Sequence, residues 1–218
     1  MRPRAAESKP ARRGSYCMSD LRFPVRPTLA GAVWPEQASS GSRFARGVLL
    51  ALVGSAVLAL SARIAVPFWP VPMTLQTLAV LLIGAVFGAR LAVATVLLYL
   101  VEGAIGLPVL AGTPQHGIGL PYMMGSTGGY LVGYIVAASI VGWFAERGAD
   151  RSFARLLGAM AVGDVVVFVL GFAWLSHLVG TTSAFELGVA PFIAGDVIKI
   201  LLAALVVPSV WNLVVKRR

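Results

Sequence analysis

The sequence predicts an all-α integral membrane protein of six transmembrane helices, with long outer loops between helices one and two and between helices three and four. Of its 218 residues, 58% are hydrophobic and only 12% are charged. The mean hydropathy of +0.84 exceeds what a soluble core of this size needs. The apolar residues also fall in runs close to the 20 or so that a helix needs to cross about 30 Å of hydrocarbon. The bilayer is therefore the expected solvent for most of the chain.

The chain divides into a disordered basic tail at 1–43 and a six-helix membrane domain at 44–218. The tail contains Pro, Ser, Gly and Arg without helical or alternating periodicity. No apolar stretch follows its basic residues until Val48, and that stretch is long enough to span, so no signal peptide is expected. Met18 is an alternative start to Met1. The single cysteine, Cys17, excludes a disulfide framework and a multi-cysteine metal site.

The six predicted spans are separated by prolines, glycines or charges. Three prolines follow the first span, "GAR" at 88–90 separates the second from the third, and glycines open the fourth. In chain order the spans are expected at 44–66, 74–87, 90–105, 125–144, 153–178 and 191–215.

The positive charges test this count independently. With six spans, sixteen of the eighteen Lys and Arg residues lie on one side of the membrane together with both termini. The opposite loops at 106–124 and 179–190 contain none, and the two exceptions are Arg63 and Lys199. The positive-inside rule makes the basic side cytoplasmic, so the net charge of +9 sets topology, with some attraction to anionic lipid. Nucleic acid is not an expected partner, since no basic-aromatic platform is present.

The first outer segment, "VPFWPVPMTLQT" at 66–77, interrupts two apolar runs. Its prolines prevent a helix, while Phe68 and Trp69 suit the membrane interface, as they would in a merely structural turn. The polar cluster at 74–77, which includes Gln76, stands at the mouth of the next span. Buried amides and hydroxyls need partners, and a ligand can supply them.

The second outer segment, "GAIGLPVLAGTPQHGIGLPYMMGSTGGYLVGY" at 103–134, has no Lys, Arg, Asp or Glu. Loops of this length are usually functional or disordered, and its apolar residues favour a folded lid. Its "GSTGG" lacks the lysine of a phosphate-binding loop, so ATP binding of that type is excluded.

The sixth span carries Asp196 and Lys199 in "GDVIK", three residues apart and hence on one helix face. Each is costly in hydrocarbon unless it is paired or faces a polar cavity. The functional interpretation is a lysine facing an anionic substrate beside an aspartate that accepts polar hydrogens. The alternative is an ion pair that only fixes helix packing. Asp164 in the fifth span has no nearby cation in the sequence.

Four motifs carry a resemblance to a known family. "VPMTLQT", "GLPVLAG", "GSTGGYLVGY" and "GDVIK" occur in this order within 44–215 and resemble the BioY family, the biotin-binding S components of energy-coupling factor (ECF) transporters. The resemblance implies a multi-pass substrate-binding protein of the bacterial cytoplasmic (inner) membrane, with both termini cytoplasmic, that captures biotin from outside with high affinity. It also implies an ECF coupling transmembrane subunit and ATPase subunits as partners.

The same resemblance suggests substrate contacts. The family's last-helix acid and lysine correspond to Asp196 and Lys199. A biotin carboxylate needs a cation, its ureido ring offers two donors and one acceptor, and its bicyclic body needs an apolar wall. The expected polar contacts are Asp196, Lys199, Gln76 and Tyr130, and the expected walls are Trp69, Leu107, Val109 and Trp174. Tyr130 and Trp174 have an alternative interpretation as core or interface aromatics.

Small residues recur every four positions along the first span, at Gly47, Ala51, Ser55 and Ala59. Such a ridge lets another helix pack closely. In S components a similar ridge docks the coupling subunit, so the resemblance implies that role, with packing inside the bundle as the alternative.

Two other function classes compete with this interpretation. A membrane enzyme would need a nucleophile with a base, or a metal cluster, whereas the two histidines, His116 and His177, are far apart in the sequence. We therefore expect no catalysis, no cofactor and no metal. An ion-coupled secondary transporter of a small anionic solute, with Asp164, Asp196 and Lys199 as its relay, remains the alternative function.

Overall fold

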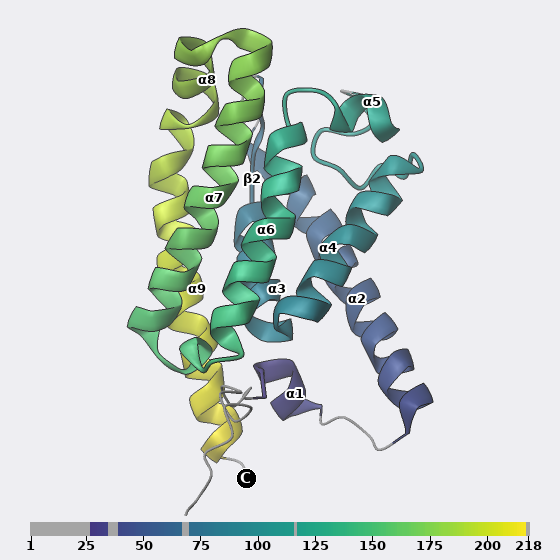
Figure 1. The fold of residues 1–218 in the computed structure, drawn as a ribbon, viewed down its shortest axis with the longest axis vertical. Coiled ribbons are helices and arrows are strands. Elements are labelled where there is room, and N and C mark those ends of the chain that lie inside the picture. The colour runs from purple at the N-terminus through teal and green to yellow at the C-terminus, as the bar shows by residue number, and fades with distance from the viewer. Residues whose placement is uncertain (1–26, 35–38, 67–69, 116, 217–218) are drawn as a thin grey trace, which may run out of the picture.

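The computed structural model describes residues 27–34, 39–66, 70–115 and 117–216 as a bundle of helices (Figure 1). The predictions for 1–26, which include the Met18 start and Cys17, and those for Phe68, Trp69 and His116, lie outside the described residues. The described strands, β1 (Ala65–Val66) and β2 (Met73–Thr74), form one antiparallel pair in which Ala65 lies opposite Thr74. The expectation of an all-helical protein is confirmed apart from this short pair.

The helices follow one another with short connections except between α2 and α3 and around α5. In chain order they are α1 (Leu29–Val33), α2 (Ser40–Arg63), α3 (Gln76–Phe87), α4 (Ala89–Ala104), α5 (Gly119–Met123), α6 (Gly128–Ala145), the 3₁₀ turn η2 (Ala149–Arg151), α7 (Phe153–Val179), α8 (Thr181–Gly188) and α9 (Ala190–Lys216).

Among the described residues, four stretches are long and apolar enough to cross a membrane: Ser40–Arg63, Gly128–Ala145, Phe153–Val179 and Thr181–Val214. Helices α3 and α4 occupy the remaining two predicted positions but are shorter. The chain therefore carries the helices of a multi-pass membrane protein, and the count of six spans stays a prediction.

Part of the predicted tail is folded. Helix α1 buries Leu29 and Ala32 and contacts α3 and α9. The guanidinium of Arg46 donates to the Ala30 carbonyl at 3.0 Å, and that of Arg151 donates to the Pro27 carbonyl at 3.3 Å. Helix α2 begins at Ser40, because the Ser39 hydroxyl accepts from the Ser42 N–H at 3.2 Å and caps it. The predicted boundary at 43/44 thus falls inside a helix.

The predicted break at 88–90 is a sharp turn between α3 and α4. Gly88 has a φ of 81°, in the left-handed region that favours glycine. The Glu146 carboxylate accepts from the Ala89 N–H at 2.9 Å and so caps the start of α4 from the end of α6. This cap ties the α3–α4 turn to the end of α6, the central helix of the bundle.

Helix α6 lies between α3, α4 and α7 and packs most closely against α7 (Figure 1). A Cβ added at Gly129 would lie 2.4 Å from the Leu170 carbonyl oxygen, and one at Gly133 would lie 2.8 Å from the Val167 Cα. Two glycines on one face of α6 therefore let α6 and α7 pack closely. Close backbone approach of this kind replaces the hydrophobic driving force that helices lack in lipid.

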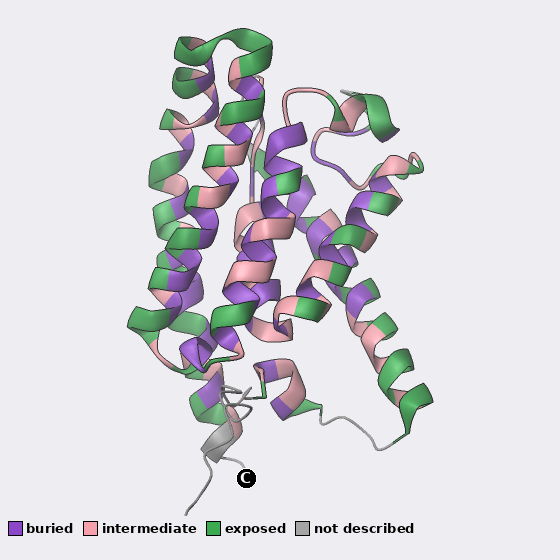
Figure 2. Ribbon diagram, in the orientation of Figure 1, coloured by how far each residue is buried: buried purple, intermediate pink, exposed green. Residues whose placement is uncertain are grey.

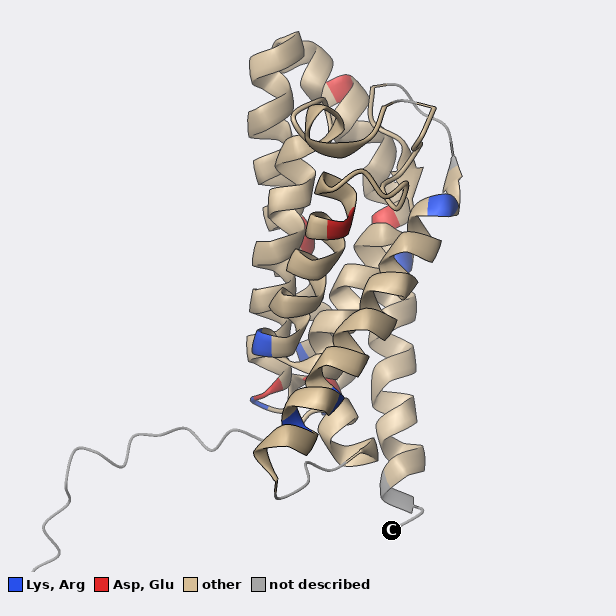
Figure 3. Ribbon diagram, turned by 90° about the vertical axis from the view of Figure 1, so that its right-hand side faces the viewer, with Lys and Arg blue, Asp and Glu red and all other residues tan. Residues whose placement is uncertain are grey.

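The outer faces of the helices are apolar, as the membrane prediction requires. Figure 2 shows buried residues toward the bundle axis and exposed ones outside. The exposed face of α2 includes Leu49, Leu52, Val53, Val57 and Leu60. In Figure 3 most of the Lys and Arg segments lie in the half of the bundle that holds the C-terminus, in agreement with one basic side.

We expect Gly129→Ala to destabilise the bundle by about 1–3 kcal/mol, because the new methyl group forces α6 away from α7. The matched control is Gly158→Ala on α7, where an added Cβ meets nothing within 4 Å. Thermal unfolding in detergent measures both. Equal melting temperatures of the two variants would contradict the close packing.

Candidate functional site

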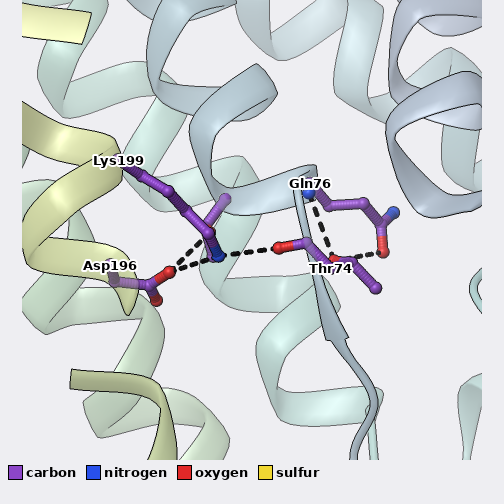
Figure 4. Close-up of polar contacts among 5 residues, drawn as sticks. Thr74, Gln76, Asp196 and Lys199 are labelled. Carbon is purple, nitrogen blue, oxygen red and sulfur yellow. Dashed lines mark hydrogen bonds and ion pairs between the residues drawn. The ribbon is translucent and has the colours of Figure 1, made fainter. Parts of the chain in front are cut away.

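An ion pair between Asp196 and Lys199 of α9 stands at the centre of the candidate site (Figure 4). The Lys199 Nζ lies 2.5 Å from Asp196 Oδ1. It also donates to the Thr74 carbonyl at 2.7 Å and to the Thr77 hydroxyl at 3.2 Å. The Thr77 hydroxyl in turn donates to Asp196 Oδ1 at 3.1 Å. The pair therefore binds α9 to the segment where β2 gives way to α3.

Gln76 is the first residue of α3, and hydrogen bonds hold both its backbone and its side chain. Its backbone N–H donates to the Thr74 hydroxyl at 3.2 Å, which donates back to Gln76 Oε1 at 3.3 Å. This local loop satisfies one of the free N–H groups at the start of α3. Gln76 Nε2 donates to the Tyr99 hydroxyl at 2.7 Å, and the side chain is buried. The amide is thus fixed in orientation at the edge of a pocket.

The pocket is enclosed by β2, α3, α6, α7 and α9, with an empty space of about 540 Å³ including its open mouth. All four predicted polar contacts, Asp196, Lys199, Gln76 and Tyr130, line it. The other lining residues are mostly apolar or aromatic: Val71, Pro72, Thr74, Thr77, Leu110, Ala111, Tyr122, Thr127, Leu131, Tyr134, Val167, Phe168 and Phe192.

Tyr130 has a structural task besides lining the pocket. Its hydroxyl donates to the Gly188 carbonyl at 2.7 Å, at the end of α8. Its ring lies against Gly171, where an added Cβ would be 2.3 Å from a ring carbon. The phenol thus fixes α6 against α7 and α8, which agrees with the alternative of a core aromatic.

None of the three predicted apolar walls that the structure describes lines the pocket. Leu107 is exposed and does not line the pocket, and Trp174 donates its indole N–H to the Gly125 carbonyl at 2.8 Å. Val109 is half-buried and leaves the lining to its neighbours Leu110 and Ala111. Sequence reasoning missed Phe192, although it lies four residues before Asp196 and hence on the same helix face.

The loop at 106–113, here called the Leu110 loop, is held through its backbone carbonyls. Arg63 donates to the Thr113 carbonyl at 3.0 Å and also to the Pro108 carbonyl. The Tyr122 hydroxyl donates to the Ala111 carbonyl at 2.5 Å, and burial raises the pKa of that phenol. Arg63 is one of the two basic residues predicted to lie away from the cytoplasmic side. Its bonds to these loop carbonyls give its charge partners there.

The two outer segments also touch each other. The Ser126 hydroxyl, from the segment before α6, donates to the Pro70 carbonyl at 2.7 Å. Both segments therefore border the same pocket mouth.

Asp164 lies in α7 one turn before Val167, which lines the pocket. The residue is 7% exposed, and its Oδ1 has no hydrogen-bond partner among the described residues. No group of three or more His, Cys, Asp or Glu residues in the described part of the chain could hold a metal ion.

The small-residue ridge of α2 mostly faces the bundle. Ala51 and Ser55 are buried, and Gly47 and Ala59 are half-buried. The Ser55 hydroxyl donates to Glu102 of α4. These positions favour the alternative in which the ridge packs within the chain.

Comparison with known proteins agrees with this geometry. Residues 34–216 match the model of the BioY family. The probable biotin transporter BioY of Pyrococcus horikoshii is 36% identical over 162 residues, which cover 74% of this chain and 94% of that protein. The biotin transporter BioY of Rhizobium etli is 40% identical over 169 residues, covering 72% and 88%.

A solved structure is similar as well. The crystal structure of the S-component for biotin from an ECF-type ABC transporter superposes with a TM-score of 0.69 at 25% identity, covering 80% of this chain and 95% of that one. The sequence resemblance is confirmed, and the chain belongs to the BioY family.

Proposed function

We propose that this chain takes up biotin across the cytoplasmic membrane as the substrate-binding S component of an ECF-type ABC transporter. The proposal is supported by membership of the BioY family and by the biotin transporters and the S-component that the chain resembles. The observation that carries it is the pocket lined by Asp196, Lys199 and Gln76. It combines a few fixed polar groups with apolar and aromatic walls, as small-molecule sites do.

The geometry changes the role we assign to Lys199. Its charge is matched by Asp196 at 2.5 Å, so the pair is neutral as a whole and attracts an anion less than a free ammonium would. The three Lys199 protons are all donated within the chain, so an incoming ureido carbonyl displaces one of their acceptors. A donor and an acceptor side by side then suit the ureido ring, which offers a carbonyl oxygen next to N–H groups. We therefore assign the Asp196–Lys199 pair to the ureido ring. The carboxylate then lies toward the outer mouth, where water can hydrate it.

We infer a six-span topology in which α2, α3, α4, α6, α7 and α9 cross the membrane and both termini are cytoplasmic. Helix α3 has 12 residues and so spans about 18 Å, less than the roughly 30 Å of the hydrocarbon core. The remaining depth is filled by β2 and the pocket. Non-helical backbone at membrane depth is tolerated where it lines a cavity, so the short helix fits a binding site on the outer side.

Transport requires partners that this chain does not contain. We propose that biotin enters beneath the two outer segments and that an ECF coupling subunit with ATPase subunits reorients the chain to release it inside. The chain itself catalyses no reaction. Because Ala51 and Ser55 are buried, the part of α2 open to a coupling subunit is its exposed apolar face.

Measuring biotin binding by variants of the Asp196–Lys199 ion pair tests the proposed function. Lys199→Met alone leaves Asp196 as an unpaired buried charge, which strongly destabilises a fold. The double variant Lys199→Met/Asp196→Asn removes both charges and keeps their volume. We expect it to fold and to bind biotin about a hundredfold more weakly, the loss of two hydrogen bonds to charged groups.

Isothermal titration of detergent-purified protein measures this loss. The control is Glu186→Gln, which removes an exposed charge from α8 and should leave affinity unchanged. Saturable micromolar binding must be seen with the unaltered chain. Its absence would refute biotin capture, and full affinity of the double variant would remove the pair from the site.

Substitutions at two neighbouring positions on α2 distinguish packing within the bundle from docking of the coupling subunit. Ser55 is 1% exposed, and Ala56 beside it is exposed. We expect Ser55→Leu to lower thermal stability and biotin binding together, because it overpacks the α2–α4 contact. Ala56→Leu should keep stability and binding but reduce ATP-driven uptake by the assembled transporter about tenfold, by disturbing the docking face. Unchanged uptake with Ala56→Leu would argue against docking on this face.

A further inference from the structure

The hydroxyl of Tyr99 joins the polar edge of the pocket to the Leu110 loop. Tyr99 belongs to α4 and is fully buried, with an exposed fraction of 0%. Its oxygen accepts from Gln76 Nε2 at 2.7 Å, and its O–H donates to the Val109 carbonyl at 3.1 Å. A phenol has only one proton to donate, so this bridge uses its whole donor capacity. One side chain thus links two pieces of chain that lie 33 residues apart in the sequence.

Both ends of the bridge border the pocket. Gln76 lines it directly, and Val109 is followed by Leu110 and Ala111, which also line it. Leu110 is 1% exposed and packs on Gly103, where an added Cβ would lie 2.8 Å from the Leu110 Cγ. A shift of the Val109 carbonyl would therefore move part of the pocket wall.

The bridge is costly to break because it is buried. Without the hydroxyl, the Gln76 amide and the Val109 carbonyl would each lose a partner at a point where Tyr99 is fully buried. Conversely, a ligand that holds the Gln76 amide in its present orientation also keeps the Gln76 N–H group in place as the donor to the Tyr99 oxygen. Chains of hydrogen bonds strengthen one another in this way.

We propose that Tyr99 is a positioning residue that couples the Gln76 amide to the Leu110 loop, so that a substrate contact at Gln76 holds the pocket wall closed and slows substrate release. The inference rests on the proposed function for the identity of the substrate. The coupling itself is a property of the described side chains and can be tested without a ligand.

Tyr122 provides a matched comparison. Its hydroxyl also holds the Leu110 loop, through the Ala111 carbonyl, but none of its described hydrogen bonds involves Gln76. A tyrosine that only clamps the loop should behave like Tyr122. A tyrosine that couples should lose its effect when the Gln76 amide is removed.

The first experiment is a double-mutant cycle on biotin dissociation, followed by chasing bound radiolabelled biotin with an excess of unlabelled biotin. We expect Tyr99→Phe to speed dissociation about tenfold or more, because the change removes two buried hydrogen bonds. In a Gln76→Met background the same change should add less than about threefold, since coupled sites are not additive. Tyr122→Phe should have the same effect in both backgrounds. Equal effects of Tyr99→Phe in the two backgrounds would overturn the coupling.

The second experiment needs no substrate and leaves Tyr99 unaltered. A single thiol is placed on the loop by Ala111→Cys, with Cys17→Ser to remove the natural one, and its rate of maleimide labelling is measured. Ala111 is 5% exposed, so labelling reports opening of the loop. We expect Gln76→Met to raise the rate about tenfold although Gln76 has no described hydrogen bond to the loop. The control is Ser139→Ala, which removes a hydroxyl from α6 outside the pocket.

An unchanged labelling rate with Gln76→Met would refute the coupling whether or not the chain binds biotin. A raised rate in a chain that fails to bind biotin would refute the proposed function and leave the coupling in place. The two failures are therefore distinguishable.

Discussion

The carbonyl of Thr74 accepts a hydrogen bond from Lys199, and the rest of the site depends on this contact between irregular backbone and a membrane helix. A lysine in the last helix is costly in hydrocarbon unless its protons find acceptors. Here it finds the Asp196 carboxylate and the backbone of β2, which is free to accept because α3 starts only at Gln76. The short third helix, the polar edge of the pocket and the buried charges of α9 therefore require one another.

Much of the fold follows from composition and periodicity. The positions of the long helices, the turn at Gly88 and the gathering of basic residues at one end could be predicted, because apolar run length and glycine placement act locally. Helix α1 could not, since its five residues are stabilised by distant partners, Arg46 and Arg151. Periodicity in a short segment carries no information about such contacts.

For the site, the sequence was most informative about polar side chains whose burial in an apolar segment costs the most free energy. Asp196, Lys199 and Gln76 stand out as polar groups among apolar ones, and all three line the pocket. The walls were predicted less well, because Leu107, Val109 and Leu110 look alike in a sequence and only the path of the loop decides which one turns inward. Tyr99 was missed for a related reason: an aromatic in an apolar helix looks like ordinary core until the partners of its hydroxyl are known.

The way in which side chains hold the Leu110 loop affects how the sequence of the pocket wall can change in evolution. Arg63, Tyr99 and Tyr122 all bind backbone carbonyls, which every amino acid possesses. Residues 109–111 can therefore be exchanged during evolution without loss of the anchors. The pocket wall can change its shape while its frame is conserved, and a scaffold of this kind can acquire a preference for a new substrate by few substitutions.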